Sequence, residues 1–302
     1  MSAEVDLHIH SRYSSDGDLT PEEIISLAEE MKLKAISIAD HDSVGAYPEA
    51  LELARGKEVE VIPSVELTTL YEEREFHLLL PFADFSHPQL VDFIRRVHEA
   101  RIVEARERIE KLRQLGFDIS WEDVFRKGTS SPPLGVVIAR RLLEKDSARR
   151  DPRLTKYFEA KNIKFAPYIF YEDYFRPGKP AYVPKRIVSI LEVLSQAKEF
   201  GAAPVLAHPG ADFEMATLND LKKLKEYGLI GLEVFSTYHD EKMTAHYLEI
   251  ARQLDLVPTA GSDFHGRIKP HVTFGCVRNG DYSMVIALRQ KIKGYNHGTR
   301  LD

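Results

Sequence analysis

The sequence predicts an α/β fold in which short parallel strands alternate with helices and a block of helices interrupts the pattern. Apolar strand-like runs alternate with helical segments before residue 85 and again after residue 185, and such alternation is typical of parallel strands joined by crossover helices. The middle of the chain lacks convincing strand alternation. We expect roughly seven strands, a number that favours a closed or nearly closed barrel over an open sheet.

The strands are expected where short apolar runs lie between turn residues. In chain order the candidates are Val5–His8, Ala35–Ala39, Glu60–Pro63, Val65–Leu70, Glu75–Leu80, Pro204–Ala207, Gly231–Phe235 and Val257–Ala260. The first helix is expected to begin at Thr20, because Thr20 and Glu23 have the spacing of a capping box around Pro21. Further helices are expected over residues 49–54, 185–200, 217–227 and 240–254.

A helical insertion is expected between the two strand-containing parts. Residues 88–115 form one long, charged, amphipathic pattern that stops at Gly116, and shorter helical stretches and an aromatic-rich piece, 165–175, follow it. The expected organisation is therefore a first barrel part at 1–85, a helical insertion at 86–184 and a second barrel part at 185–302.

Composition and charge exclude several classes of protein. The chain has 302 residues, of which 43% are hydrophobic and 29% charged, so a disordered or collagen-like chain is excluded. The net charge of −6 argues against a stable nucleic-acid complex. No apolar run has the ~18–20 residues needed to cross a bilayer, and Met1–His10 does not resemble a signal peptide. The single cysteine, Cys276, fits a reducing cytoplasm. Nothing in the sequence predicts an oligomeric state.

Histidines and carboxylates gather at the ends of the expected strands. His8 and His10 have the i, i+2 spacing that points two strand residues to one face, and Asp263 and His265 repeat that spacing. Most of these groups follow the carboxyl ends of strands, where barrel enzymes build their sites. The other polar groups of this set are Asp16, Asp40, His41, Asp42, Glu66, His77 and His208.

These segments together resemble the polymerase and histidinol phosphatase (PHP) family. The matching motifs, in order, are D-L-H-I-H, S-D-G, D-H-D, V-E-L-T, F-H-L, A-H-P-G and G-S-D-F-H. The resemblance implies a distorted seven-stranded β/α barrel with two or three metal ions. It also implies nine metal ligands, and all nine positions are filled here, by His8, His10, Asp16, His41, Glu66, His77, His208, Asp263 and His265. It further implies one ion at His8, His10, Glu66 and Asp263, with Glu66 bridging to a second ion, and a remaining ion at Asp16, His41 and His208.

The ligand set and the resemblance predict metal-dependent hydrolysis of a phosphate ester. Imidazoles with carboxylates favour Mn, Fe or Zn over Mg or Ca. A metal-bound hydroxide is expected to attack phosphorus in line with the leaving alkoxide, without a covalent intermediate. Among the ligands, Asp263, His208 and Glu66 are the expected catalytic residues.

The segment at residues 175–184 resembles the branch of the family that acts on nucleotides. That branch includes phosphatases of 3′,5′-nucleoside bisphosphates and 5′-to-3′ exoribonucleases, so the expected substrate is a small phosphorylated molecule, a nucleotide or short RNA. Lys179, Arg176 and Arg140 are the expected substrate contacts. The chain departs from that branch where Gly135 and Val137 stand in place of an Arg and a His.

Alternatives remain at this point. The chain could be a phosphomonoesterase for another metabolite, such as histidinol phosphate, a non-catalytic PHP module, or a metal hydrolase of C–N or C–O bonds. Asp6, Asp40 and Asp42 could orient ligand imidazoles or could cap turns, and Glu233 could serve the site or form a structural salt bridge.

Overall fold

The described part of the chain contains eight strands in two sheets. This computed structural model describes residues 3–125, 131–211 and 215–297. The first sheet is parallel and has the order β1-β2-β3, with β1 at Val5–Ile9, β2 at Ala35–Ile38 and β3 at Glu60–Val61. The second sheet has the order β4-β5-β6-β7-β8. Its strands are Glu66–Tyr71, Arg74–Leu79, Val205–Leu206, Gly231–Ser236 and Val257–Gly261.

The prediction of one seven-stranded barrel is not confirmed. Between the two sheets, the described residues form only single bridges, one joining Ile9 to Phe264 and one joining His41 to Glu66. The strand β5 also runs antiparallel to both β4 and β6, because β4 and β5 are joined by a tight turn with a left-handed residue at Glu72. A hairpin of this kind reverses the chain, so the sheet is mixed rather than wholly parallel.

Left-handed backbone interrupts the chain where the strands end. Asp42, His208 and Asp263 have positive φ values of 51°, 24° and 54°. A residue in this region cannot continue a β ladder. The chain therefore turns away from the sheets at three of the positions where the sequence predicts the site.

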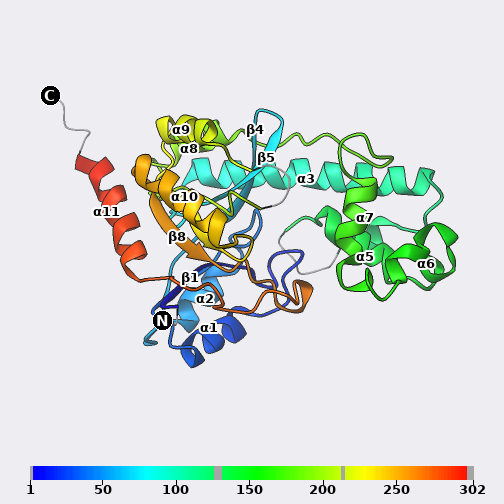
Figure 1. Cartoon of the computed structure of the whole chain (residues 1–302), viewed down its shortest axis with the longest axis horizontal. Helices are drawn as coiled ribbons and strands as arrows, with labels where there is room; N and C mark the ends of the chain where they lie inside the picture. Colours follow the sequence, from blue (N-terminus) through cyan, green and yellow to red (C-terminus); the bar gives the residue numbers. More distant parts are fainter. Residues whose placement is uncertain (1–2, 126–130, 212–214, 298–302) are drawn as a thin grey trace. The chain divides into compact units, whose positions relative to one another are not determined.

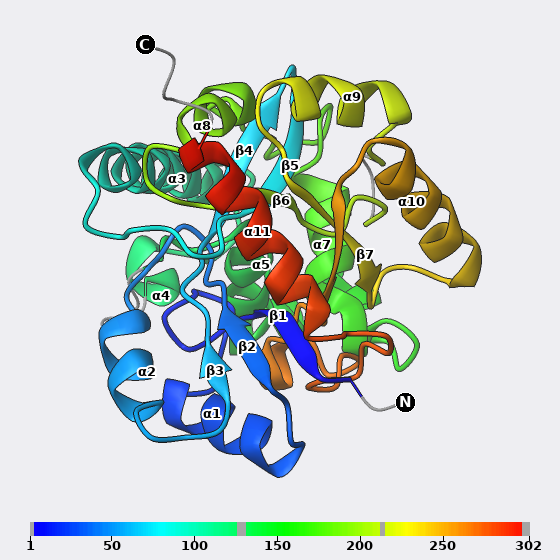
Figure 2. The same ribbon diagram turned by 90° about the vertical axis from the view of Figure 1, so that its left-hand side faces the viewer.

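Helices flank both sheets (Figure 1). They are α1 (Pro21–Glu30), α2 (Tyr47–Leu53), α8 (Ile190–Gln196), α9 (Leu218–Glu226), α10 (Glu241–Gln253) and α11 (Ser283–His297), with a short 3₁₀ turn, η3, at Gly266–Ile268. The predicted capping box at the start of α1 is confirmed: the Thr20 hydroxyl accepts from the Glu23 amide, and the Glu23 carboxylate accepts from the Thr20 amide. Figure 2 shows α1 and α2 near the first sheet, and α9 and α10 on the side of the second.

Two helices differ from expectation. The helix expected over residues 185–200 is limited to α8: residues 182–188 form no helix, and the Leu70 amide donates to the Val188 carbonyl. The helix α11 was not expected, although Val285 and Leu288 are buried there and pack in one apolar cluster with Val5 and Val257.

The chain divides into two compact units, residues 1–97 with 188–302 and residues 98–187. The helix α3 (Pro88–Gln114) contributes residues to both. The second unit also contains α4 (Trp121–Val124), α5 (Gly135–Leu143), α6 (Asp146–Arg150), η1 (Pro152–Phe158), η2 (Ile163–Phe165) and α7 (Ala166–Tyr174). It has its own apolar core, in which Phe170 and Leu142 are fully buried. No helix in the described part of the chain is long and apolar enough to cross a bilayer.

Candidate metal centre

Nine side chains from the strand ends of the first unit meet in one cluster. His8 lies on β1, Glu66 on β4 and His77 on β5, whereas the others lie in the loops that follow β1, β2, β6 and β8. Seven of the nine are buried; His77 and His208 keep 19% and 15% of their side chains exposed. Each member lies within 4 Å of another member.

Glu66 is the hub of the cluster. Its Oε2 atom lies 2.9 Å from His41 Nδ1, 3.1 Å from His10 Nε2 and 3.3 Å from His8 Nε2. Its Oε1 atom lies 2.8 Å from His77 Nδ1 and 3.2 Å from His208 Nε2. One carboxylate thus faces five imidazoles, which is the arrangement expected of a ligand shared between ions.

Candidate ligand atoms fall into three groups within 4.8 Å of one another. They are His8, His10, Glu66 and Asp263; His41, Glu66 and His77; and His10, Asp16, His41 and His265. The structure groups Asp16 with His265, whose Nε2 lies 3.3 Å from Asp16 Oδ2, rather than with His208. His208 lies beside Glu66 instead, because its backbone leaves β6 in a left-handed conformation.

The buried polar atoms of this cluster are better suited to binding a metal than to forming hydrogen bonds with one another. Five buried atoms make no hydrogen bond of good geometry: Asp16 Oδ1, His41 Nδ1, Glu66 Oε2, Asp263 Oδ1 and His265 Nε2. Orphaned buried polar atoms are costly, and a native fold rarely gathers several in one place without a partner for them. Mixed imidazole and carboxylate donors are the ligands of divalent transition metals, so the residues fit such ions.

Neighbouring acceptors orient the imidazoles. The His8 Nδ1 atom lies 3.0 Å from Glu233 Oε1, so an Nδ1–H there leaves Nε2 facing the cluster. His10 Nδ1 lies 3.1 Å from the Ser14 hydroxyl, which also accepts from the His41 amide. Of the two roles the sequence left open for Glu233, the structure favours the one at the site: its second oxygen accepts from the His208 amide at 2.7 Å.

Asp6, Asp40 and Asp42 accept hydrogen bonds from other segments of the chain. Asp6 accepts from the Ser262 amide at 2.9 Å, and Asp40 accepts from the amide and hydroxyl of Ser11, both at 2.7 Å. Asp42 accepts from the amide and hydroxyl of Thr68, the residue two positions beyond Glu66. These hydrogen bonds join segments far apart along the chain, so they match neither the turn- and helix-capping role nor a direct contact with an imidazole ring.

Electrostatics keep the carboxylates of the cluster ionised. Burial would lower the pKa of His8 and His10, but the neighbouring carboxylates raise both, that of His10 to about 9, so these two imidazoles must lose a proton to bind a cation. Burial would raise the pKa of Glu66, but the surrounding imidazoles, His41 first, hold that pKa well below its usual range. Burial likewise opposes ionisation of Asp263, and the Lys269 ammonium holds its pKa well below the usual range. Burial lowers the pKa of His265 to about 4. The carboxylates are therefore ionised, and at least one imidazole is neutral, at neutral pH.

The expected substrate contacts all lie in the second unit. Arg176 follows α7, and its Nε donates to Glu172 at 3.0 Å. Lys179 is exposed in a turn in which its amide donates to the Arg176 carbonyl at 2.9 Å. Arg140 is half-buried on α5. That these three residues contact the substrate therefore remains a prediction.

Packing explains the glycine at position 135. A Cβ atom there would lie 2.6 Å from the Tyr171 ring and 2.7 Å from Arg108 Nη1. Arg108 is 4% exposed and its guanidinium also lies 4.9 Å from the centre of the Phe175 ring. The space that a side chain at Gly135 would take is already filled by a buried arginine of α3.

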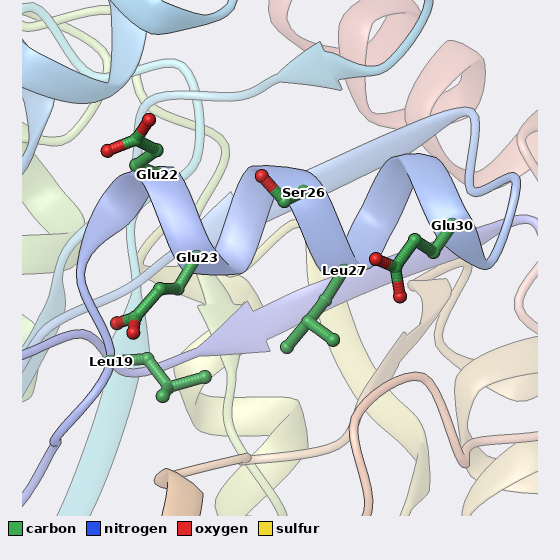
Figure 3. Close-up of a pocket in the computed structure, with 6 residues that line it drawn as sticks. All are labelled: Leu19, Glu22, Glu23, Ser26, Leu27 and Glu30. Carbon is green, nitrogen blue, oxygen red and sulfur yellow. The ribbon is translucent and has the colours of Figure 1, made fainter.

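A separate hollow along α1 is not the site. It has a volume of about 450 Å³ and is lined by Leu19, Glu22, Glu23, Ser26, Leu27 and Glu30 (Figure 3). None of these residues belongs to the metal groups. Its three glutamates would also repel a phosphorylated substrate.

Sequence reasoning missed four polar residues around the ligands. Glu75 lies 3.1 Å from His77 Nε2, and its i, i+2 spacing to His77 on a strand was a usable signal. Ser14, Tyr238 and Lys269 also contact ligands. They lie in loops, where no periodic pattern could have identified them.

Comparisons with known proteins identify the family to which the chain belongs. The PHP domain profile matches residues 6–122. The chain is 30% identical over 264 residues to the 5′-3′ exoribonuclease Rnm of Salmonella typhimurium, covering 86% of this chain and 84% of that protein. It is 26% identical over 265 residues to the 3′,5′-nucleoside bisphosphate phosphatase of Chromobacterium violaceum, covering 87% of each. A solved structure from Bifidobacterium adolescentis, assigned as a metal-dependent phosphoesterase, superposes with a TM-score of 0.80 at 26% identity and covers 96% of this chain and 97% of that one. The chain therefore belongs to the PHP family and is a metal-dependent phosphoester hydrolase.

Proposed function

We propose that this enzyme hydrolyses a phosphate ester of a nucleotide or short oligonucleotide with two or three bound ions of Mn, Fe or Zn. The observation that carries the proposal is the set of five buried ligand atoms in this cluster that make no hydrogen bond of good geometry. The alternative of a non-catalytic module is disfavoured, because all nine ligand positions hold donor side chains in mutual contact.

The three groups would hold the ions as follows. His8, His10, Glu66 and Asp263 would form one site, and Glu66 would link it to a second with His41 and His77. Asp16 and His265 would hold a third. His10 and His41 belong to two groups each, and because a neutral imidazole has one free lone pair, each would serve one ion at a time. Divalent ions, when bound, supply a water of lowered pKa and neutralise charge on the phosphoryl oxygens.

The protein residues then have distinct tasks. Glu66 and Asp263 present buried carboxylate oxygens whose positions are fixed by the strand β4 and by the turn after β8. His208 is 15% exposed, so of the three expected catalytic residues it is the most accessible to a substrate oxygen. We propose that His208 Nε2, held 3.2 Å from Glu66, contacts the reacting phosphoryl group.

The first experiment tests the metal centre. Metal content is measured on purified protein before and after chelation, together with hydrolysis of p-nitrophenyl phosphate. His8→Ala and Asp263→Ala are each expected to lose most bound metal and activity. His246→Ala, an exposed histidine of α10, is the matched control. Full activity in metal-free protein would overturn the proposal.

The substrate class follows from the relatives' names and from the sequence, and a second experiment tests it. A panel should include a 3′,5′-nucleoside bisphosphate, a mononucleotide, a short 5′-phosphorylated RNA and histidinol phosphate. The first or third is expected to give the highest kcat/KM. A preference for histidinol phosphate would instead support the alternative, a phosphomonoesterase that acts on that metabolite.

We retain Lys179, Arg176 and Arg140 as candidate contacts to a second phosphate, within a helical insertion at 86–184. A charge-assisted phosphate contact is worth roughly 1.5–3 kcal/mol, or about 10- to 100-fold. Lys179→Ala should lower kcat/KM by that factor on a bisphosphate and much less on p-nitrophenyl phosphate. Equal losses on both substrates would refute this assignment. The cytoplasmic location and the absence of a stable nucleic-acid complex remain parts of the proposal.

A further inference from the structure

The two oxygens of Asp263 have different surroundings. Its Oδ2 atom accepts from the Tyr238 hydroxyl at 2.5 Å and from Lys269 Nζ at 2.5 Å. Its Oδ1 atom accepts no hydrogen bond of good geometry, although it is buried. That atom lies 3.1 Å from His10 Nε2 and 3.5 Å from His8 Nε2, inside the first ligand group.

Two loops bring the donors to one point. Tyr238 follows β7, and Lys269 follows η3, six residues beyond Asp263 along the chain. Lys269 Nζ also donates to the Tyr238 hydroxyl at 2.8 Å, so the three groups close a triangle. The Lys269 side chain is only 12% exposed, and its ammonium group is directed inward at this carboxylate.

The backbone of Asp263 is fixed independently of its side chain. Its φ is +54°, its amide donates to the His8 carbonyl at 2.8 Å, and its carbonyl lies 2.8 Å from His265 Nδ1. The remaining freedom is rotation of the carboxylate. Two donors on Oδ2 remove that freedom and leave Oδ1 directed at the imidazoles.

We propose that Tyr238 and Lys269 are positioning residues that make Asp263 a one-oxygen ligand. By occupying Oδ2 they prevent the carboxylate from turning both oxygens toward an ion, and they hold Oδ1 at the distance set by His8 and His10. This inference rests on the proposed metal centre, because it concerns how that centre receives Asp263. Neither residue is assigned a contact with substrate.

A structural role is the competing explanation. A buried ammonium–carboxylate pair can hold two loops together without any effect on a ligand atom. The two explanations differ in the protein without metal. A structural pair stabilises that protein as well, whereas a positioning pair acts chiefly on the affinity and geometry of the bound ion.

The experiment uses Co²⁺ as the probe, because its visible absorption reports the number and type of ligand atoms. Tyr238→Phe and Lys269→Met are compared with wild type by Co²⁺ titration against a competing chelator and by the spectrum of the loaded protein. Each variant is expected to bind Co²⁺ about 10- to 100-fold more weakly and to show an altered spectrum. Lys269→Arg, which keeps a donor, is expected to recover part of the affinity.

Two pairs outside the metal groups provide controls. The Tyr282 hydroxyl donates to Glu60 at 2.8 Å, and Lys34 Nζ donates to Glu4 at 2.6 Å, and none of these four residues belongs to the metal groups. Tyr282→Phe and Lys34→Met should therefore leave Co²⁺ binding unchanged.

The outcomes separate this inference from the proposed function. Wild-type protein that binds no Co²⁺ would overturn the metal centre and, with it, this inference. Wild-type binding together with unchanged affinity and spectrum in both variants would overturn the positioning role alone. A lowered melting temperature of the metal-free variants, with unaltered Co²⁺ affinity, would assign the pair to structure.

Discussion

Replacing Glu233 with Gln is the sharpest test of how the imidazoles are oriented. Glu233 is fully buried on β7, and its two oxygens serve different partners: Oε1 lies 3.0 Å from His8 Nδ1, and Oε2 accepts from the His208 amide at 2.7 Å. Glutamine keeps the shape of the side chain but has one oxygen and one NH₂ group. If the oxygen keeps the His208 amide, the NH₂ group faces His8 Nδ1.

That reversal changes the tautomer of His8. An NH₂ group facing Nδ1 favours the imidazole with its proton on Nε2, the atom that lies 3.3 Å from Glu66 Oε2 in the cluster. A protonated Nε2 has no lone pair for a metal. Loss of a carboxylate that orients a histidine ligand typically lowers metal affinity 10- to 100-fold, or about 1.4–2.7 kcal/mol.

The assay is a metal titration against a competing chelator, followed by kcat/KM at limiting and at saturating metal. Glu60→Gln is the control. Glu60 lies on β3, accepts a hydrogen bond from the Tyr282 hydroxyl and belongs to no metal group. The variant should need more metal for half-maximal activity than wild type and the control. Identical metal affinity in all three proteins would refute the orienting role of Glu233.

Three further outcomes are expected. Asp220→Asn should lower the free energy of unfolding at pH 7 by about 1–3 kcal/mol in urea, because Asp220 accepts twice from Arg74 at 2.6 and 2.9 Å. Burial would raise the pKa of Asp220, but Arg74 lowers it from 3.8 to about 2. This stabilisation is therefore complete above pH 3.8 and is lost as the pH falls toward 2, so the variant and wild type should converge there. Metal loading at pH 7 should release protons into a weak buffer, because the nearby carboxylates outweigh burial and raise the pKa of His10 to about 9; loading without proton release would contradict this. Gly261→Ala should reduce bound metal, measured by elemental analysis, because its Cβ would lie 2.0 Å from Glu233 Oε1; a full complement of metal would show that Glu233 can move aside.

Part of the cluster could be predicted from the sequence because it follows a local rule. His8 and His10 share a face of one strand, and Asp263 with His265 repeats that spacing after another. The other residues of the cluster were predicted to lie close together because most of them lie at or near the ends of neighbouring strands. The structure adds what spacing cannot give, such as the pairing of Asp16 with His265 at 3.3 Å.

The barrel and the orienting groups were harder to predict, and for a physical reason. Closure of a sheet depends on ladder hydrogen bonds between distant strands, and here single bridges such as the one from Ile9 to Phe264 replace a full ladder. Tyr238 and Lys269 act through hydrogen bonds between loops far apart in sequence. No apolar period marks such residues, so only their contacts reveal them.

The charge of the centre connects binding with chemistry. The whole chain carries a net charge of −6, which would repel an anionic ester at long range. Among the proposed ligands only Asp16, Glu66 and Asp263 are carboxylates, and two divalent ions would carry more positive charge than these three carry negative. Local attraction for phosphate therefore depends on the same ions that serve the reaction, so a loss of metal should weaken phosphate binding together with turnover. The contacts from Glu233, Tyr238 and Lys269 therefore affect both phosphate binding and turnover. Each acts by fixing the direction of a ligand atom, not by contacting the substrate itself.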